Sequence, residues 1–112
     1  MALIAVQEPA LTGTVVTYTA ASASDAFLPD DRTLLHVKNA GGSPDTVTVT
    51  TPGTAAGGLA ITDAISSVAN ATEEFIGPFP AQHFADPATG LATVTHSFTT
   101  SVTVAVVRAA QR

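Results

Sequence analysis

Alternating apolar and polar positions predict a series of short β-strands. The cleanest alternation covers residues 45–51, where Val47 and Val49 fall on one side of an extended chain and threonines on the other. A two-residue period with one polar face is typical of a half-buried antiparallel strand. Residues 33–39 alternate less strictly, and residues 39–44 between the two segments are rich in turn formers. We therefore predict that residues 33–39 and 45–51 form a β-hairpin.

Four further segments are predicted to be strands because they are rich in apolar and β-branched residues. They are residues 12–20, 59–68, 91–96 and 101–108. In the last of these, Val102, Val104 and Val106 line one face. The apolar positions of residues 59–68 also fit one helical face, but two serines favour a strand that ends at Val68. No segment has convincing helix start and stop signals.

Turn-forming residues separate these strands. They predict turns or loops at residues 21–25, 27–32, 52–58, 70–72 and 85–90, and a tight connection at residues 98–100. Within residues 27–32, Asp30 is expected to hydrogen-bond its own backbone. About seven or eight short strands at roughly ten-residue spacing are typical of an antiparallel all-β fold. We expect a single β-sandwich or jelly-roll-like domain over residues 11–112.

Residues 1–10 are interpreted as an N-terminal arm, because they are apolar until Gln7, Glu8 and Pro9 interrupt the run. Such an arm either lies along its own sheet as an edge strand or reaches onto a neighbouring subunit, and the sequence leaves both open. The apolar run is too short for a spanning helix and has no basic start for a signal peptide. We expect a soluble intracellular product with no membrane association.

The segment of residues 75–84 contains three of the five phenylalanines and two prolines. Because aromatic side chains bury large apolar areas, we predict that this segment is the packing centre. Proline cannot donate a backbone hydrogen bond, so a strand that enters at Phe75 is expected to break at Gly77 and Pro78. The segment then closes one end of the fold with Phe79 and Phe84.

Composition narrows the function classes. The 112-residue chain has no cysteine, a net charge of −5 and only four basic residues, which form no cluster. Nucleic-acid binding is therefore not expected, since it requires clustered Lys and Arg. Charged residues make up only 12 % of the chain. Such a low fraction indicates a surface partly covered by a partner, although a threonine-rich sheet face also explains it.

The titratable residues form no recognisable site in the sequence. His36, His83 and His96 lie too far apart for a metal motif, and His83 is expected to hydrogen-bond the backbone of the broken strand. The adjacent carboxylates at residues 30–31 and 73–74 point to opposite faces of an extended chain and form no dyad. We expect no catalytic, metal or cofactor-binding residues, no cofactor and no enzymatic activity.

A glycan-binding sandwich is a weaker alternative, motivated by the fold class and the glycine-rich loops at residues 41–42 and 52–58. Such sites usually need exposed Trp or Tyr platforms, and this chain offers only Tyr18.

Four segments together carry a family resemblance. They are residues 17–21 (Thr-Tyr-Thr-Ala-Ala), 32–39 (Arg-Thr-Leu-Leu-His-Val-Lys-Asn), 76–80 (Ile-Gly-Pro-Phe-Pro) and 102–108 (Val-Thr-Val-Ala-Val-Val-Arg). With these segments the chain resembles the small β-sandwich capsid decoration, or cement, proteins encoded beside the major capsid protein in tailed phages and prophages. Two turns depart from the family pattern, at residues 70–72 and at Asp31.

The resemblance implies a structural virion protein, made in the cytoplasm of the bacterial host, that binds the major capsid protein and stabilises the shell. It also implies a homo-oligomer, with a trimer expected. The acidic balance favours the outer capsid surface over the DNA-filled interior, where phosphate would repel it. A head–tail connector or tail component is the nearest alternative.

Overall fold

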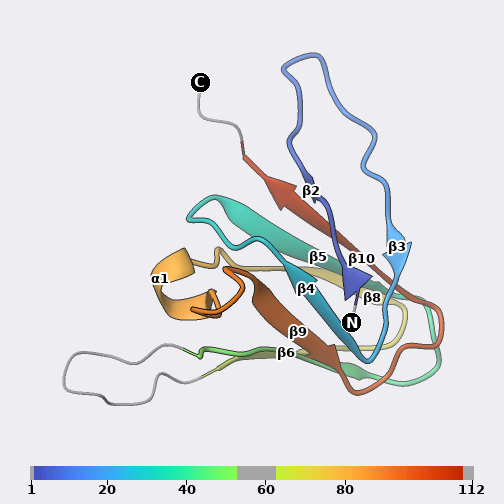
Figure 1. Cartoon of the computed structure of the whole chain (residues 1–112). Coiled ribbons are helices and arrows are strands. Elements are labelled where there is room, and N and C mark those ends of the chain that lie inside the picture. The colour runs from blue at the N-terminus through green and yellow to red at the C-terminus, as the bar shows by residue number, and fades with distance from the viewer. Residues whose placement is uncertain (1, 53–62, 110–112) are drawn as a thin grey trace.

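The chain forms two packed β-sheets in the computed structural model, which describes residues 2–52 and 63–109 (Figure 1). The first sheet has the strand order β1 (Ala2–Leu3), β4 (Ser24–Phe27), β9 (Ala92–His96), β6 (Asp45–Val49) and β7 (Ala64–Val68). The second sheet has the order β2 (Val6–Gln7), β10 (Val102–Arg108), β5 (Thr33–Asn39) and β8 (Thr72–Ile76), and β3 (Thr19–Ala20) also pairs with β10. The predicted all-β sandwich is confirmed.

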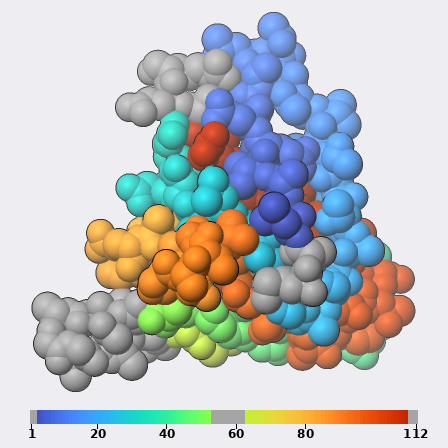
Figure 2. Space-filling view, in the orientation of Figure 1, coloured from blue at the N-terminus to red at the C-terminus, as the bar shows by residue number. Residues whose placement is uncertain are grey.

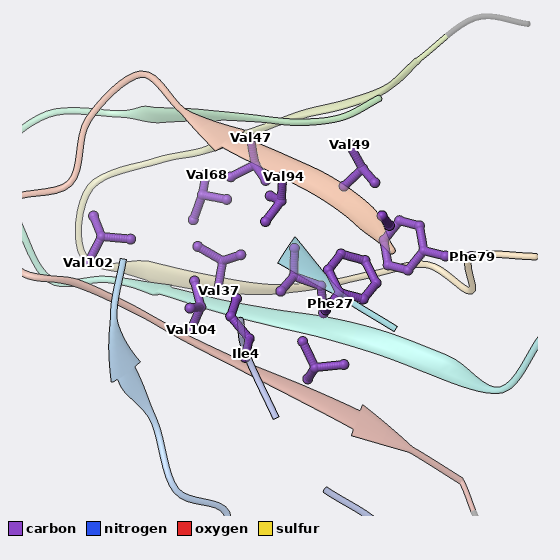
Figure 3. Close-up of a cluster of buried hydrophobic side chains, with 13 residues drawn as sticks. Ile4, Phe27, Val37, Val47, Val49, Val68, Phe79, Val94, Val102 and Val104 are labelled. Carbon is purple, nitrogen blue, oxygen red and sulfur yellow. The ribbon is translucent and has the colours of Figure 1, made fainter. Parts of the chain in front are cut away.

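The core lies between the sheets and is made by the inward half of each alternating strand (Figure 3). The first sheet contributes Phe27, Val47, Val49, Val68 and Val94, and the second contributes Leu35, Val37, Val102, Val104 and Val106. The predicted valine face of β10 is therefore confirmed, as is the strand ending at Val68. Each such side chain contributes roughly 1.5–3 kcal/mol when it leaves water.

The predicted hairpin of residues 33–39 and 45–51 is wrong, although both strands exist. β5 pairs with β8 and β10 in the second sheet, whereas β6 pairs with β7 and β9 in the first. Alternation shows which face of a strand is buried, but it does not show which sheet the strand joins. β5 and β6 each bury one face, and they belong to different sheets. The connection between them is long enough to cross the roughly 10 Å that separates packed sheets.

Buried polar groups fix this crossing. The Asn39 amide donates hydrogen bonds to the carbonyl oxygens of Ser43, 2.8 Å away, and Val68, 3.1 Å away, so it joins β5 to the first sheet. The Gly41 amide donates to the Asn39 side chain. A Cβ at Gly41 would lie only 2.4 Å from the Thr100 carbonyl oxygen, so this turn requires glycine for close packing.

The strand predicted for residues 12–20 is shorter in the structure, where β3 covers Thr19–Ala20. The loop predicted for residues 21–25 is partly wrong, because β4 begins within it. The predicted strand is shortened because β2 and β3 pair with the same edge of β10. β2 already occupies β10 at Val106 and Val107, so β3 reaches it only at Thr103 and Val104. β4 was missed because its first three residues, Ser24, Asp25 and Ala26, are small or polar and carry no β-strand signal.

The N-terminal arm lies along its own sheets, as one of the two readings expected. β1 pairs in parallel with β4 and β2 pairs in parallel with β10, so the arm bridges both sheets. Ile4 between them is buried in the core. Residues 2–7 are therefore built into the sandwich.

The segment of residues 75–84 closes one end of the core, with one correction. β8 ends at Ile76 before a cis Gly77–Pro78 bond, Phe79 is buried, and its ring packs edge-on against Phe27 and Phe84. A single-turn helix, α1 (Ala81–Phe84), follows where no helix was expected. Phe75, however, faces solvent and does not belong to the packing centre.

The predicted turns are largely confirmed. Asp30 accepts a hydrogen bond from the Arg32 amide, as expected for its turn role. Turns also occur at residues 70–71 and 87–89. The loop predicted at residues 52–58 lies outside the described residues except for Pro52.

Candidate functional site

The outer face of the second sheet carries a cluster of aromatic and charged side chains. We call Tyr18, His36, Lys38, Glu73 and Phe75 the aromatic patch. The strand register explains the grouping, because His36 lies opposite Phe75 on β8 and opposite Ala105 on β10. Lys38, one row along, lies opposite Glu73. Tyr18 directly precedes β3, whose Thr19 pairs with Val104, and so comes beside Ala105.

His36 is the centre of the aromatic patch. Its Nδ1 lies 2.7 Å from the Tyr18 hydroxyl, and its ring stacks on Phe75 with centroids 4.0 Å apart and planes inclined by 13°. Its Nε2 lies 3.3 Å from a Glu73 carboxylate oxygen. These contacts bury the imidazole on a face that would otherwise meet water. His36 therefore holds the patch together.

Lys38 and Glu73 face each other across the β5–β8 ladder, but their charged ends contact other groups. The Lys38 ammonium lies 4.1 Å from the centroid of the Tyr18 ring, across β10 and away from β8. Glu73 turns to His36. A hollow of about 420 Å³ opens beside the pair, and Thr72, Ser101 and Thr103 also line it. Both charges thus border an open space.

A second candidate surface is the loop between β2 and β3. The Gln7 side-chain amide donates to the Thr17 carbonyl oxygen at 2.7 Å and accepts from the Thr17 amide at 2.8 Å. One side chain thus reproduces the pair of hydrogen bonds that joins neighbouring strands and closes the base of the loop. We call residues 8–16 the stapled loop. It projects away from the two sheets (Figure 1, Figure 2).

The tip of the stapled loop exposes two large apolar side chains. A turn forms there through the hydrogen bond from the Gly13 amide to the Ala10 carbonyl oxygen, and the Thr14 hydroxyl accepts from the Ala10 amide. Leu11 is 83 % exposed and Val15 is 93 % exposed. Burial of such side chains against a partner is favourable, so the tip is suited to contact another surface.

The remaining titratable residues do not join these surfaces. His96 lies in the first sheet, hydrogen-bonded to Asp45, whereas His36 lies in the second. The backbone hydrogen bond expected for the His83 side chain is not formed within residues 2–52 and 63–109. Its Nε2 lies 3.1 Å from the Gln82 side-chain amide, and its Nδ1 is buried without a hydrogen-bond partner in the described part of the chain. The opposite orientation of the adjacent glutamates is confirmed, since Glu73 contacts His36 and Glu74 accepts a 2.6 Å hydrogen bond from Ser66.

Residues 2–52 and 63–109 contain no group of three or more His, Asp or Glu side chains placed to hold a metal ion. Within the same ranges, no helix has the length and apolar character needed to cross a membrane.

The sequence analysis predicted no site residues, so it missed Phe75 and Lys38, and it counted Tyr18 as the one Trp or Tyr that the chain offers as a platform. In the structure the Tyr18 ring is covered by Lys38 and its hydroxyl is bound to His36, whereas Phe75 is 63 % exposed. A signal for Phe75 was present, because it shares one face of β8 with the charged Glu73 two residues before it.

Comparison of the chain with models of known protein families, with curated proteins and with solved structures finds no match.

Proposed function

We propose that this protein is a structural virion protein that binds the outer surface of a capsid shell and stabilises it. Its direct partner in this proposal is the major capsid protein, and the chain itself assembles as a homo-oligomer, most simply a trimer at the local threefold positions of the shell. Two observations support the proposal: the family resemblance of four segments and a projecting loop suited to docking.

The stapled loop is the observation that carries the proposal. Apart from Glu8 at its base, which pairs with Arg108, the stapled loop contains no charged residue. Leu11 and Val15 are almost fully exposed to water at its tip. Burial of the two side chains on a partner would contribute roughly 1.5–3 kcal/mol each. Because the Gln7 bonds already order the base of the loop, less conformational entropy is lost on binding.

Shell stabilisation follows from such binding by mass action. A protein that binds the assembled shell and not the separate capsid subunits lowers the free energy of the assembled state. Hundreds of equivalent sites on one lattice multiply a modest affinity per copy into a large effect on the particle. The net charge of −5 opposes a location beside packaged DNA and favours the outer surface.

Cryo-electron microscopy of purified particles from the phage or prophage that encodes this chain tests the proposal. We expect density for the sandwich at regular outer positions of the shell, with the stapled loop against the capsid protein. Absence of the chain from the particles would refute the proposal. A few copies confined to the neck or tail would replace it with the head–tail connector or tail alternative.

A further inference from the structure

Phe75 provides an apolar platform with a rigid backing. Its ring lies 4.0 Å from the buried His36 ring in a nearly parallel stack, and His36 is held in turn by the Tyr18 hydroxyl. More than half of the Phe75 side chain still meets water. A flat ring fixed on one side and open on the other is suited to stack against a ligand with an apolar face.

One cationic and one anionic residue lie next to this platform on the same face of the β5–β8 ladder. Two residues along a strand span roughly 6.6 Å, so Glu73 lies within reach of a ligand that covers Phe75. Lys38, its cross-strand neighbour, turns its ammonium toward the Tyr18 ring but lines the same hollow as Glu73, so a ligand that extends from Phe75 into the hollow reaches it. Three residues that carry hydroxyls, Thr72, Ser101 and Thr103, line the adjoining hollow of about 420 Å³. The site therefore combines one aromatic ring, one cation, one anion and several hydroxyls.

This combination selects among ligand classes. A phosphorylated ligand would meet the Glu73 carboxylate and a chain of net charge −5. A wholly apolar ligand would remove Lys38 and Glu73 from water without new partners, which is costly. A sugar ring has an apolar C–H face for Phe75 and hydroxyls that both donate to Glu73 and accept from Lys38.

We propose that the aromatic patch and the adjoining hollow bind a short saccharide, stacked on Phe75 and hydrogen-bonded by Lys38 and Glu73. This activity is separate from capsid binding, which is assigned to the stapled loop. In this proposal the aromatic platform is Phe75, and ligand stacking explains why Phe75 is exposed.

Saturation-transfer NMR on the full-length chain tests the proposal directly. The probes are soluble di- to tetrasaccharides of glucose, galactose, mannose and N-acetylglucosamine, at concentrations that detect millimolar affinity. We expect saturation of the C–H protons on one ring face of at least one probe. If none of the probes receives saturation, the proposal is overturned.

Variants then locate the binding. We expect Phe75→Ala to weaken the affinity for the bound saccharide at least tenfold, Glu73→Gln to weaken it severalfold, and Phe75→Trp to strengthen it through a larger platform. Ile65→Ala is the matched control, because Ile65 is equally exposed but lies on β7 of the other sheet. Unchanged affinity in Phe75→Ala, or an equal loss in Ile65→Ala, would overturn the proposal.

Two measurements separate this result from folding and from the capsid role. Thermal unfolding shows whether each variant is folded, and Phe75→Leu, which keeps an apolar side chain but no ring, is expected to remain folded and to lose at least tenfold in affinity. Retained affinity in a folded Phe75→Leu variant would also count against stacking. Capsid association of Phe75→Ala is expected to stay unchanged, so the two proposals fail independently.

Discussion

The Asp45 carboxylate accepts a 2.6 Å hydrogen bond from the His96 imidazole, and both side chains are fully buried. The two residues lie on neighbouring strands, β6 and β9, at the end of the core that the chain crosses after Asn39. Asp45 also accepts from the Phe98 amide. This carboxylate therefore joins two strands and the following turn, and its removal leaves buried donors without a partner.

Asp45→Ala is expected to lower the free energy of unfolding by at least about 2 kcal/mol, because the buried His96 imidazole and the Phe98 amide both lose their hydrogen-bond acceptor. Urea denaturation followed by circular dichroism measures the change. Asp31→Ala is the control, since Asp31 is exposed and a surface change of this kind stays within about 0.5 kcal/mol. A loss below 1 kcal/mol for Asp45→Ala would contradict the structural role given to the pair.

Replacement of Leu11 and Val15 by serine is expected to weaken binding to capsid shells at least about tenfold, because the apolar area buried at the interface is lost. Co-sedimentation of the variant with shells that lack the protein measures the effect. Thermal stability should not change, since both side chains are exposed in the free chain. Ile65→Ser removes a comparable exposed side chain elsewhere and should bind normally. Equal binding by the double variant and the natural chain would remove the stapled loop from the proposed function.

Gln7→Ala tests the closure of the stapled loop. The Thr17 amide donates to the Gln7 side chain, so its hydrogen exchange should be slow in the natural chain and faster in the variant. Exchange at the Val47 amide in β6, a strand of the other sheet, is the internal reference. If the Thr17 amide exchanges equally fast in both chains, the Gln7 bonds do not order the loop in solution.

Ile4→Ala should lower the free energy of unfolding by about 2–5 kcal/mol, since Ile4 is buried in the core. Leu3→Ala is the adjacent control, because Leu3 is exposed. Chemical denaturation of the two variants provides the comparison. Deletion of residues 1–10 would remove Ile4 with the rest of the arm. A loss of capsid binding in such a deletion variant would therefore reflect lower fold stability as well as any lost contact with the capsid. Equal stability of the Leu3 and Ile4 variants would contradict the placement of the arm.

Ala71→Gly is expected to raise the free energy of unfolding by about 1 kcal/mol. Ala71 has φ +61°, which is strained for a residue with a side chain and permitted for glycine. Gly77→Ala should act in the opposite direction, by at least about 1 kcal/mol. Gly77 has φ +132°, and a Cβ there would lie 2.9 Å from the Thr33 carbonyl oxygen. Thermal unfolding measures both changes. A destabilised Ala71→Gly variant would show that the strain is not as described.

The fold class and most long strands could be predicted from the sequence, because alternation reports directly which side chains leave water. The partners of each strand could not. Val37 and Val47 show the same period and the same burial, yet they belong to different sheets. The polar contacts of Asn39 favour a crossing over a hairpin, and one of them depends on the position of Val68, far along the chain.

The candidate surfaces were less predictable for a related reason. The cluster of phenylalanines at residues 75–84 indicated a core, but the break at Gly77 separates Phe75 on an outer face from Phe79 on an inner one. The stapled loop depends on a side chain at Gln7 that imitates backbone pairing with Thr17. No periodicity in the sequence reports such a contact.

The repeated crossing between sheets has a consequence for how the chain folds. Among the described strands, β6 and β7 are the one sequential pair joined by hydrogen bonds, and the other ladders join strands separated by at least one strand in the chain. Strands that are far apart in the chain must therefore come together before these ladders can form. The conformational entropy lost in this step is offset only later, when the contacts form. Refolding on the millisecond-to-second scale is the kinetic behaviour expected from this connectivity.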